Sequence, residues 1–338
     1  TAIFPRELQF QKDGNGTDGV SILGTAEARN NNTSAFLVHS FFTGSGLNFR
    51  TQLGVTQEKV NINFAQTIAS FLVAGQTNID QASARQTEHR REISTDRGFF
   101  AQEEVNINDK VVFTVGIRAD KSSRNGDANK LYYYPKASLA LNIHEFVDME
   151  GGALSTAKLR AAFGQSGNFA PFGAIYSNFT PVVIEGSTGS FINFSRGNPD
   201  LEPERQTELE FGFDLGLFNN SVLLDFTYYN KSVDDLILPT QQATSSGFTN
   251  YWLNAAEIEN TGFEIGLDLT PVESEMLTWN SRISFWKNNA EVTRLDVPAF
   301  NTGAFGATLG TYRIETGKSP TQLVGRPVVE GVPTVWGD

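Results

Sequence analysis

The side chains able to do chemistry are scattered along this chain rather than grouped. His39, His89 and His144 stand apart, without the short spacing that places two imidazoles on one zinc ion. Ser166 lies in GQSGN, which lacks the paired glycines of a nucleophile elbow. The sequence therefore predicts no catalytic residue, no metal site and no cofactor, and it disfavours an enzyme.

Two carboxylates in the segment NPDLEPE are the strongest exception. Glu202 and Glu204 could form an acid–base pair or a calcium site, because carboxylates this close can share a proton or a cation. Pro199 precedes them and Pro203 lies between them, however, and proline restricts the backbone to turn and extended conformations. We therefore interpret the segment as a rigid turn that leads into a strand.

Composition restricts the class of protein. The 338 residues include 31 Gly and 27 Phe but only two Met, a balance typical of strands and turns. No apolar run is long enough for a membrane helix. The net charge of −12 argues against a nucleic-acid partner, and the absence of Cys excludes disulfides and thiolate metal sites.

Strict alternation of apolar and polar residues is the most informative pattern. Between residues 208 and 217, Leu209, Phe211, Phe213, Leu215 and Leu217 fall on one side of an extended chain. The stretches 222–228 and 263–269 repeat the pattern. The opposite side carries the carboxylates Glu208, Glu210, Asp214, Glu264 and Asp268. Long strands with one apolar and one charged face are typical of a transmembrane β-barrel, which has lipid outside and water inside.

The same reading along the chain predicts about eleven strands. We place them at 20–29, 33–42, 47–59, 92–107, 110–121, 131–144, 157–167, 204–217, 221–237, 259–271 and 277–294. Short links alternate with long ones, which lie at 60–91, 168–203, 238–258 and 296–338. Outer-membrane barrels have short periplasmic turns, long external loops and even strand numbers. The fold class predicted is thus all-β, an antiparallel transmembrane β-barrel of which residues 1–338 form a part.

The segment GNPDLEPERQTELEFGFDLGLFNNSVLLDFTYYNKSVDDLILP, residues 197–239, resembles the TonB-dependent outer-membrane transporters, and in particular their SusC/RagA-like subgroup. YYYPKASLAL (132–141), LRAAFGQSGN (159–168), NAAEIENTGFEIGL (254–267) and the later GKSPTQLVGRP are similar to other parts of that family's barrel wall. The resemblance implies a 22-stranded barrel with an N-terminal plug, of which this chain would hold about eleven strands. The plug and the C-terminal strands would lie outside residues 1–338.

The resemblance also implies partners and a place in the cell. Transporters of this family lie in the outer membrane, contact its lipid, and draw energy from the TonB–ExbB–ExbD complex through the plug and its TonB box. The subgroup usually carries a SusD-like lipoprotein as a lid. The implied function is import of a nutrient such as a glycan or peptide.

Aromatic residues in the long loops are the candidate ligand contacts. Interleaved with Asn, Ser and Gly, such rings suit stacking on sugars or gripping peptide side chains. The speculative substrate-binding set is Phe172, Tyr176, Phe179, Phe191, Phe194, Tyr251 and Trp252. The alternative is that these rings pack against each other, against a lid protein or at the membrane surface. For the carboxylates named above, we expect a position facing the lumen, in contact with water or the plug.

Three other classes remain open on the sequence alone. A passive porin would share the two-faced strands but would need neither plug nor energy coupling. A soluble or surface β-sandwich adhesion module would bury the apolar faces in a protein core. An outer-membrane enzyme is disfavoured by the scattered His and Ser residues.

Overall fold

The computed structural model describes residues 2–4, 19–73, 76–147, 153–305 and 310–325. Over these ranges the chain is built almost entirely from strands, with three single-turn 3₁₀ helices: η2 (Ile79–Gln81), η3 (Ile143–Glu145) and η4 (Thr244–Ser246). None of the helices in the described ranges is long and apolar enough to cross a membrane. The predicted all-β fold class is confirmed.

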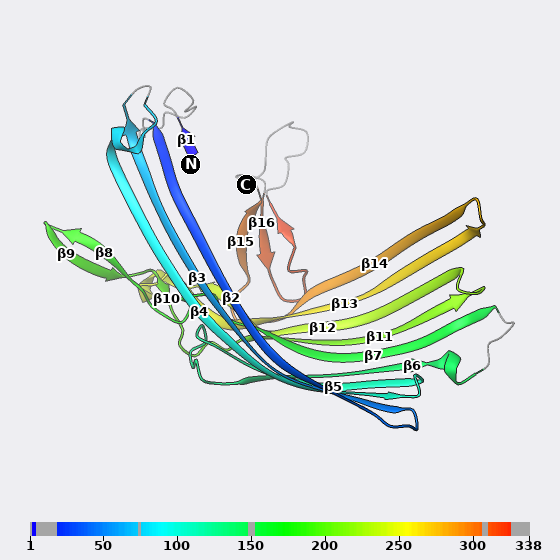
Figure 1. Cartoon of the computed structure of the whole chain (residues 1–338). Helices are drawn as coiled ribbons and strands as arrows, with labels where there is room; N and C mark the ends of the chain where they lie inside the picture. Colours follow the sequence, from blue (N-terminus) through cyan, green and yellow to red (C-terminus); the bar gives the residue numbers. More distant parts are fainter. Residues whose placement is uncertain (1, 5–18, 74–75, 148–152, 306–309, 326–338) are drawn as a thin grey trace. The chain divides into compact units, whose positions relative to one another are not determined.

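Most strands belong to one sheet of twelve, shown in Figure 1. Its members are β1 (Ala2–Phe4), β2 (Val20–Phe42), β3 (Leu47–Leu72), β4 (Ala82–Ile107), β5 (Val111–Ser122), β6 (Tyr132–Asn142), β7 (Leu154–Asn168), β10 (Ser195–Arg196), β11 (Glu204–Leu217), β12 (Val222–Gln241), β13 (Asn250–Glu273) and β14 (Thr278–Leu295). The path runs in chain order from β1 to β7, then through β11, β12 and β13, with β14 on β13. Next neighbours in sequence are therefore next neighbours in the sheet, as in an up-and-down barrel wall.

Two small sheets stand apart from this wall. The hairpin of β8 (Phe179–Ile184) and β9 (Ser187–Ile192) interrupts the connection between β7 and β11. β15 (Phe300–Phe305), β16 (Gly310–Ile314) and β17 (Leu323–Val324) form a three-stranded sheet after β14. The chain divides into two compact units, residues 1–34 with 56–97 and residues 35–55 with 98–338, which we describe separately.

In the second unit, register keeps the two faces of the wall distinct across neighbouring strands. Phe211 pairs with Tyr228, and Phe213 pairs with Phe226, so the apolar positions of β11 meet those of β12. Phe226 in turn lies opposite Ile265 of β13. A slip of one residue would exchange the two faces, so the alternation itself fixes the register. We call the side bearing these residues the apolar face and the opposite side the polar face.

The apolar face is exposed rather than packed into a core. Phe211 keeps 50% of its surface exposed, Ile283 keeps 56% and Phe285 keeps 56%. Four rings nevertheless touch in a row across four strands: Phe213–Phe226 at 5.2 Å, Phe226–Phe263 at 6.4 Å and Phe263–Phe285 at 5.8 Å between centroids. A large exposed apolar band on a monomer marks a surface that something apolar covers.

Tight turns join the strands at the ends where we predict short links. Asn108 and Asp109, between β4 and β5, both have positive φ, at 52° and 59°. Consecutive positive φ values characterise the hairpin turn whose twist matches that of paired strands, and Asn and Asp tolerate them best among residues with a Cβ. Phe218, Asn219 and Asn220 play the same role between β11 and β12.

The long strands extend further than the sequence predicts. The strands expected at 20–29 and 33–42 are one continuous β2, and the loop expected at 60–91 shrinks to residues 73–81. The stretch 238–258, also expected as a loop, belongs to β12 and β13 except for residues 242–249. Backbone pairing needs no apolar face, so a ladder continues through polar residues such as Asn30–Asn32, where alternation gives no signal. The expected loop 296–338 holds β15 to β17, and its last residues lie outside the described ranges.

The aromatic row gives a stability prediction. Phe226→Ala removes two ring contacts, whereas Phe285→Ala at the end of the row removes one. Because each aromatic pair contributes about 0.5–1.5 kcal/mol beyond area burial, we expect Phe226→Ala to cost more unfolding free energy by that amount. Urea unfolding in detergent measures the difference. Equal losses for the two variants would contradict a contribution from ring contacts.

Candidate functional site

The polar face gathers acidic side chains from separate strands around one open hollow. Glu208 and Glu210 of β11 and Glu264 of β13 line it. Two cations face them, Arg160 from β7 and Lys231 from β12. The remaining lining residues are Thr227, Tyr229, Asn260 and Asn288. Three of the five predicted carboxylates therefore share one site, although they lie up to 56 residues apart in sequence.

The other two predicted carboxylates are held in ion pairs. Arg160 donates from Nε to Oδ1 of Asp214 at 3.0 Å and from Nη2 to Thr227 at 3.1 Å. Asp268 accepts two hydrogen bonds from Arg282, at 2.6 and 2.7 Å. Asp214 and Asp268 therefore have cationic partners from neighbouring strands, whereas no ion pair within the described residues engages Glu208, Glu210 or Glu264.

This arrangement suits hydrogen bonding to water, to a polar solute or to another protein surface. The hollow has no nucleophile with an adjacent base, which covalent catalysis would require. Its acceptors, Glu208, Glu210 and Glu264, and its donors, Arg160 and Lys231, come from four different strands. The hollow therefore provides hydrogen-bond donors and acceptors to water or to a polar surface that lies against it.

The first five loop aromatics lie in the connection between β7 and β11 and are exposed. The exposed fractions are 47% for Phe172, 62% for Tyr176, 69% for Phe179, 41% for Phe191 and 58% for Phe194. The rings of Phe191 and Phe194 contact each other, with 5.9 Å between centroids. These side chains are free to meet a ligand or a second protein.

Tyr251 and Trp252 have a different environment, at the start of β13. The guanidinium of Arg196 lies over the Tyr251 ring, 4.6 Å from its centroid. Trp252 is partly buried against a cluster of buried aliphatic side chains, and its backbone carbonyl accepts a hydrogen bond from Asn198 at 3.0 Å. Tyr251 and Trp252 therefore contact the residues at the end of the loop between β7 and β11, whereas the five preceding aromatic side chains are exposed on that loop.

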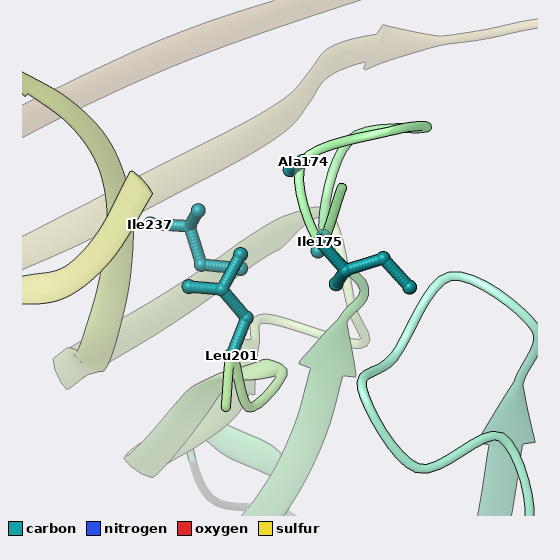
Figure 2. Close-up of a cluster of buried hydrophobic side chains, with 5 residues drawn as sticks. Ala174, Ile175, Leu201 and Ile237 are labelled. Carbon is teal, nitrogen blue, oxygen red and sulfur yellow. The ribbon is translucent and has the colours of Figure 1, made fainter. Parts of the chain in front are cut away.

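The aliphatic cluster beneath the loop is shown in Figure 2. Leu201 points toward Ile237 of β12, and Ala174 and Ile175 lie beside them. Leu201 is only 2% exposed. Leu201 is the central residue of NPDLEPE. The segment therefore buries an apolar side chain whose burial the sequence did not predict. An isolated Leu between prolines gives no periodic signal from which burial could be predicted.

Hydrogen bonds pin the same segment to β12 and β13. The side chain of Asn254 accepts from the Glu202 amide at 3.1 Å and donates to the carbonyls of Glu202 and Asp235 at 2.9 and 2.7 Å. Glu204 accepts from the amide of Ile237 at 2.9 Å. The carboxylates of NPDLEPE are therefore used in local structure, which agrees with the interpretation of a rigid turn.

A surface contact adds to this arrangement. Lys130, between β5 and β6, donates a hydrogen bond to Glu202. That bond raises the pKa of Lys130 above its usual value. Close by in sequence, Gly126 packs so tightly on Pro199 that an added Cβ would lie 1.5 Å from the proline carbonyl oxygen. The loop between β5 and β6 is thus shaped to fit the NPDLEPE segment.

The hydrogen bonds of Asn254 generate a testable prediction. Asn254→Ala removes three bonds to backbone groups, each worth about 1 kcal/mol, so we expect unfolding free energy to fall by about 2–3 kcal/mol. Asn289→Ala, on an exposed side chain of β14, is the matched control and should change stability by no more than about 0.5 kcal/mol. Denaturant titration in detergent measures both. Equal stability of the two variants would show that Asn254 does not anchor the segment.

With the fold and the polar face described, comparison with known proteins is informative. The family model for TonB-dependent receptor-like β-barrels matches residues 6–331. TonB-dependent receptor P39 of Formosa agariphila is 31% identical over 220 residues, which cover 64% of this chain and 20% of that protein. TonB-dependent receptor SusC of Bacteroides thetaiotaomicron is 23% identical over 207 residues, 58% of this chain and 21% of SusC.

A solved structure shows the same wall. The RagAB peptide transporter matches with a TM-score of 0.76 and 19% identity, over 88% of this chain and 34% of that chain. The chain covers about a fifth of the length of the curated relatives it matches. The apolar face is therefore a membrane-facing surface, and the β-sandwich alternative is wrong for this fold. The chain belongs to the TonB-dependent receptor-like β-barrel family, is similar to its SusC/RagA-like members, and lies in the outer membrane.

Proposed function

We propose that residues 1–338 form part of the barrel wall of a plugged transporter that imports a nutrient such as a glycan or peptide. The observation that carries this proposal is the two-faced wall: exposed apolar rings lie on one side, and on the other is a shared hollow whose three carboxylates have no ion-pair partner in the part of the chain that the structure describes. A wall with lipid on one side needs a polar opposite side only if water, solute or a polar plug lies there.

In this proposal the polar face contacts the plug or the passing solute. Glu208, Glu210 and Glu264 offer acceptors to the backbone amides, hydroxyls or cationic side chains of whatever fills the lumen. Arg160 and Lys231 offer donors between them. Polar contacts of this kind exchange readily with water, so they would hold a plug that must rearrange on each transport cycle.

The exposed loop aromatics would take the first step, capture of the nutrient. Tyr176, Phe179 and Phe194 have more than half of their surface exposed and lie on the loop between β7 and β11. Tyr251 and Trp252 would serve by holding the base of that loop. Because the aliphatic cluster and Asn254 anchor the base, ring positions would be set before a ligand arrives, which lowers the entropy cost of binding.

Two partners follow from the proposal. Energy would come from the TonB–ExbB–ExbD complex through the plug, as the family's name suggests. A SusD-like lipoprotein would cover the loops, by analogy with the RagAB transporter and SusC. No catalytic step is part of the proposal, because import breaks no covalent bond.

Uptake in cells tests the proposal against a passive porin. Cells expressing the complete protein would be given fluorescent malto-oligosaccharides and, separately, fluorescent oligopeptides. We expect uptake of one probe class that stops when tonB is deleted or a protonophore is added. Uptake that persists without TonB and without the proton gradient would instead indicate a porin, and uptake of neither class would contradict nutrient import of the proposed kind.

The aromatic set gives a sharper prediction with the same assay. Phe191→Ala combined with Phe194→Ala removes the contacting ring pair from the loop. Loss of two stacking surfaces should weaken binding of the transported probe by about 1–2 kcal/mol, which is roughly five- to thirtyfold in Kd. Tyr133→Ala, which removes an equally exposed ring from β6, is the control and should leave Kd unchanged. Equal effects in both would exclude a specific role for the loop pair.

A further inference from the structure

A second polar hollow lies within the first compact unit and is lined only by residues of that unit. It has a volume of about 290 Å³ and is lined by residues of three successive strands. The lining consists of Glu27 and Arg29 from β2, Asn61 and Asn63 from β3, and His89 and Arg91 from β4. All six side chains are polar, and they include both hydrogen-bond donors and acceptors.

Internal contacts hold four of the six side chains in place. Arg29 is ion-paired to Glu27 at 2.6 Å. His89 Nε2 lies 2.7 Å from Oδ1 of Asn63, so this nitrogen carries the hydrogen and donates it. The lining is therefore ordered by bonds across and along the strands before any ligand binds.

The other two side chains have unused capacity. Oδ1 of Asn61 is buried and has no hydrogen-bond partner. A buried acceptor without a partner costs about 1–3 kcal/mol unless something donates to it. Arg91 is exposed, and no ion pair among the described residues engages its guanidinium. Among the described residues, the hollow thus contains one buried acceptor without a donor, Oδ1 of Asn61, and one cation without an ion-pair partner, Arg91.

Strand length indicates that the hollow lies outside the hydrocarbon. β3 has 26 residues and β4 has 26, whereas a membrane-spanning strand needs about 9–11. Around the hollow β4 is polar on both faces, since residues 88–92 read Glu-His-Arg-Arg-Glu. Neither face of that stretch could contact lipid, so the hollow is accessible to water-soluble ligands.

The chemistry of the lining selects one ligand class. Arg91 fits a carboxylate or a sulfate, which a guanidinium binds through paired hydrogen bonds. Asn61 fits a hydroxyl donor next to that anion. A peptide would need apolar lining for its side chains, and the six residues provide none. We propose that this hollow binds an acidic oligosaccharide, with Arg91 on the anionic group and Asn61 on a neighbouring hydroxyl.

This proposal does not depend on the proposed import, because binding is measured on purified protein without transport. Calorimetry on the complete protein in detergent would use trigalacturonate as the carboxylate probe and a sulfated trisaccharide as the sulfate probe. Maltotriose, which is neutral, and trialanine are the comparison ligands. We expect one acidic probe to bind, and its affinity to fall as salt is raised, because the contact is ionic and exposed.

The matched variants are Arg91→Gln and Arg90→Gln. They remove the same charge from adjacent positions of β4 that point to opposite faces, and Arg90 already has Glu92 at 3.1 Å and the Phe64 ring beneath it. We expect Arg91→Gln and Asn61→Ala to weaken binding of the acidic probe at least tenfold, and Arg90→Gln less than twofold.

Several results would overturn the proposal. They are failure of both acidic probes to bind, binding of maltotriose or trialanine at equal or higher affinity, or equal loss in the Arg91 and Arg90 variants. Thermal unfolding of each variant shows whether a loss of binding comes from loss of the site or from loss of the fold. A folded Arg91→Gln protein that binds the acidic probe normally would also contradict the proposal.

Discussion

Backbone hydrogen bonding in the absence of water is the constraint on which the rest of this structure depends. Each strand of a wall that faces lipid must pair its amides and carbonyls with neighbouring strands, because hydrocarbon supplies no partner. The sheet order follows the chain order wherever a short turn joins two strands, which is the simplest way to meet that demand. Side chains are then free to specialise by face, and the paired registers of β11, β12 and β13 keep lipid-facing rings apart from carboxylates.

The loop between β7 and β11 shows how exposed aromatic side chains can be carried on an ordered connection. Leu201 is buried among aliphatic side chains, while Asn254 satisfies the backbone of the segment that carries it. The exposed rings thereby rest on a small core of their own, independent of the membrane. Such a satellite core explains how a long loop can be ordered while its aromatic residues remain in water.

Alternation predicted most of the wall, because one face of each strand must be apolar where it meets lipid. The bounds of β11 were predicted to the residue, and its two faces pair as expected. Prediction failed in the first three long strands: β2 was divided at Asn30–Asn32, and residues 60–72 of β3 and 82–91 of β4 were expected to be a loop. In β2 and β4, polar residues on both faces remove the periodic signal, although the backbone ladder persists; β3 keeps Val60, Ile62 and Phe64 on one face, so there the alternation was present and was missed.

The candidate sites, like the strands, were predictable from the sequence only in part. The carboxylates of β11 and β13 could be placed on one face from sequence, but their shared hollow with Arg160 required the order of the strands. The burial of Leu201 and the hollow around Asn61 and Arg91 arise from contacts between distant segments. Local patterns carry no trace of such contacts, so only the three-dimensional structure reveals them.

The most direct test of the account is a scan of the two faces of β11. Because the chain has no Cys, single Cys variants at residues 208 to 213 can each carry one spin label. In lipid nanodiscs, collision with oxygen reports lipid and collision with a water-soluble nickel complex reports water. The account predicts oxygen contact at Leu209, Phe211 and Phe213 and nickel contact at Glu208, Glu210 and Gly212. Uniform contact along the strand, or the opposite phase, would contradict a wall with lipid on its apolar face and water on its polar face.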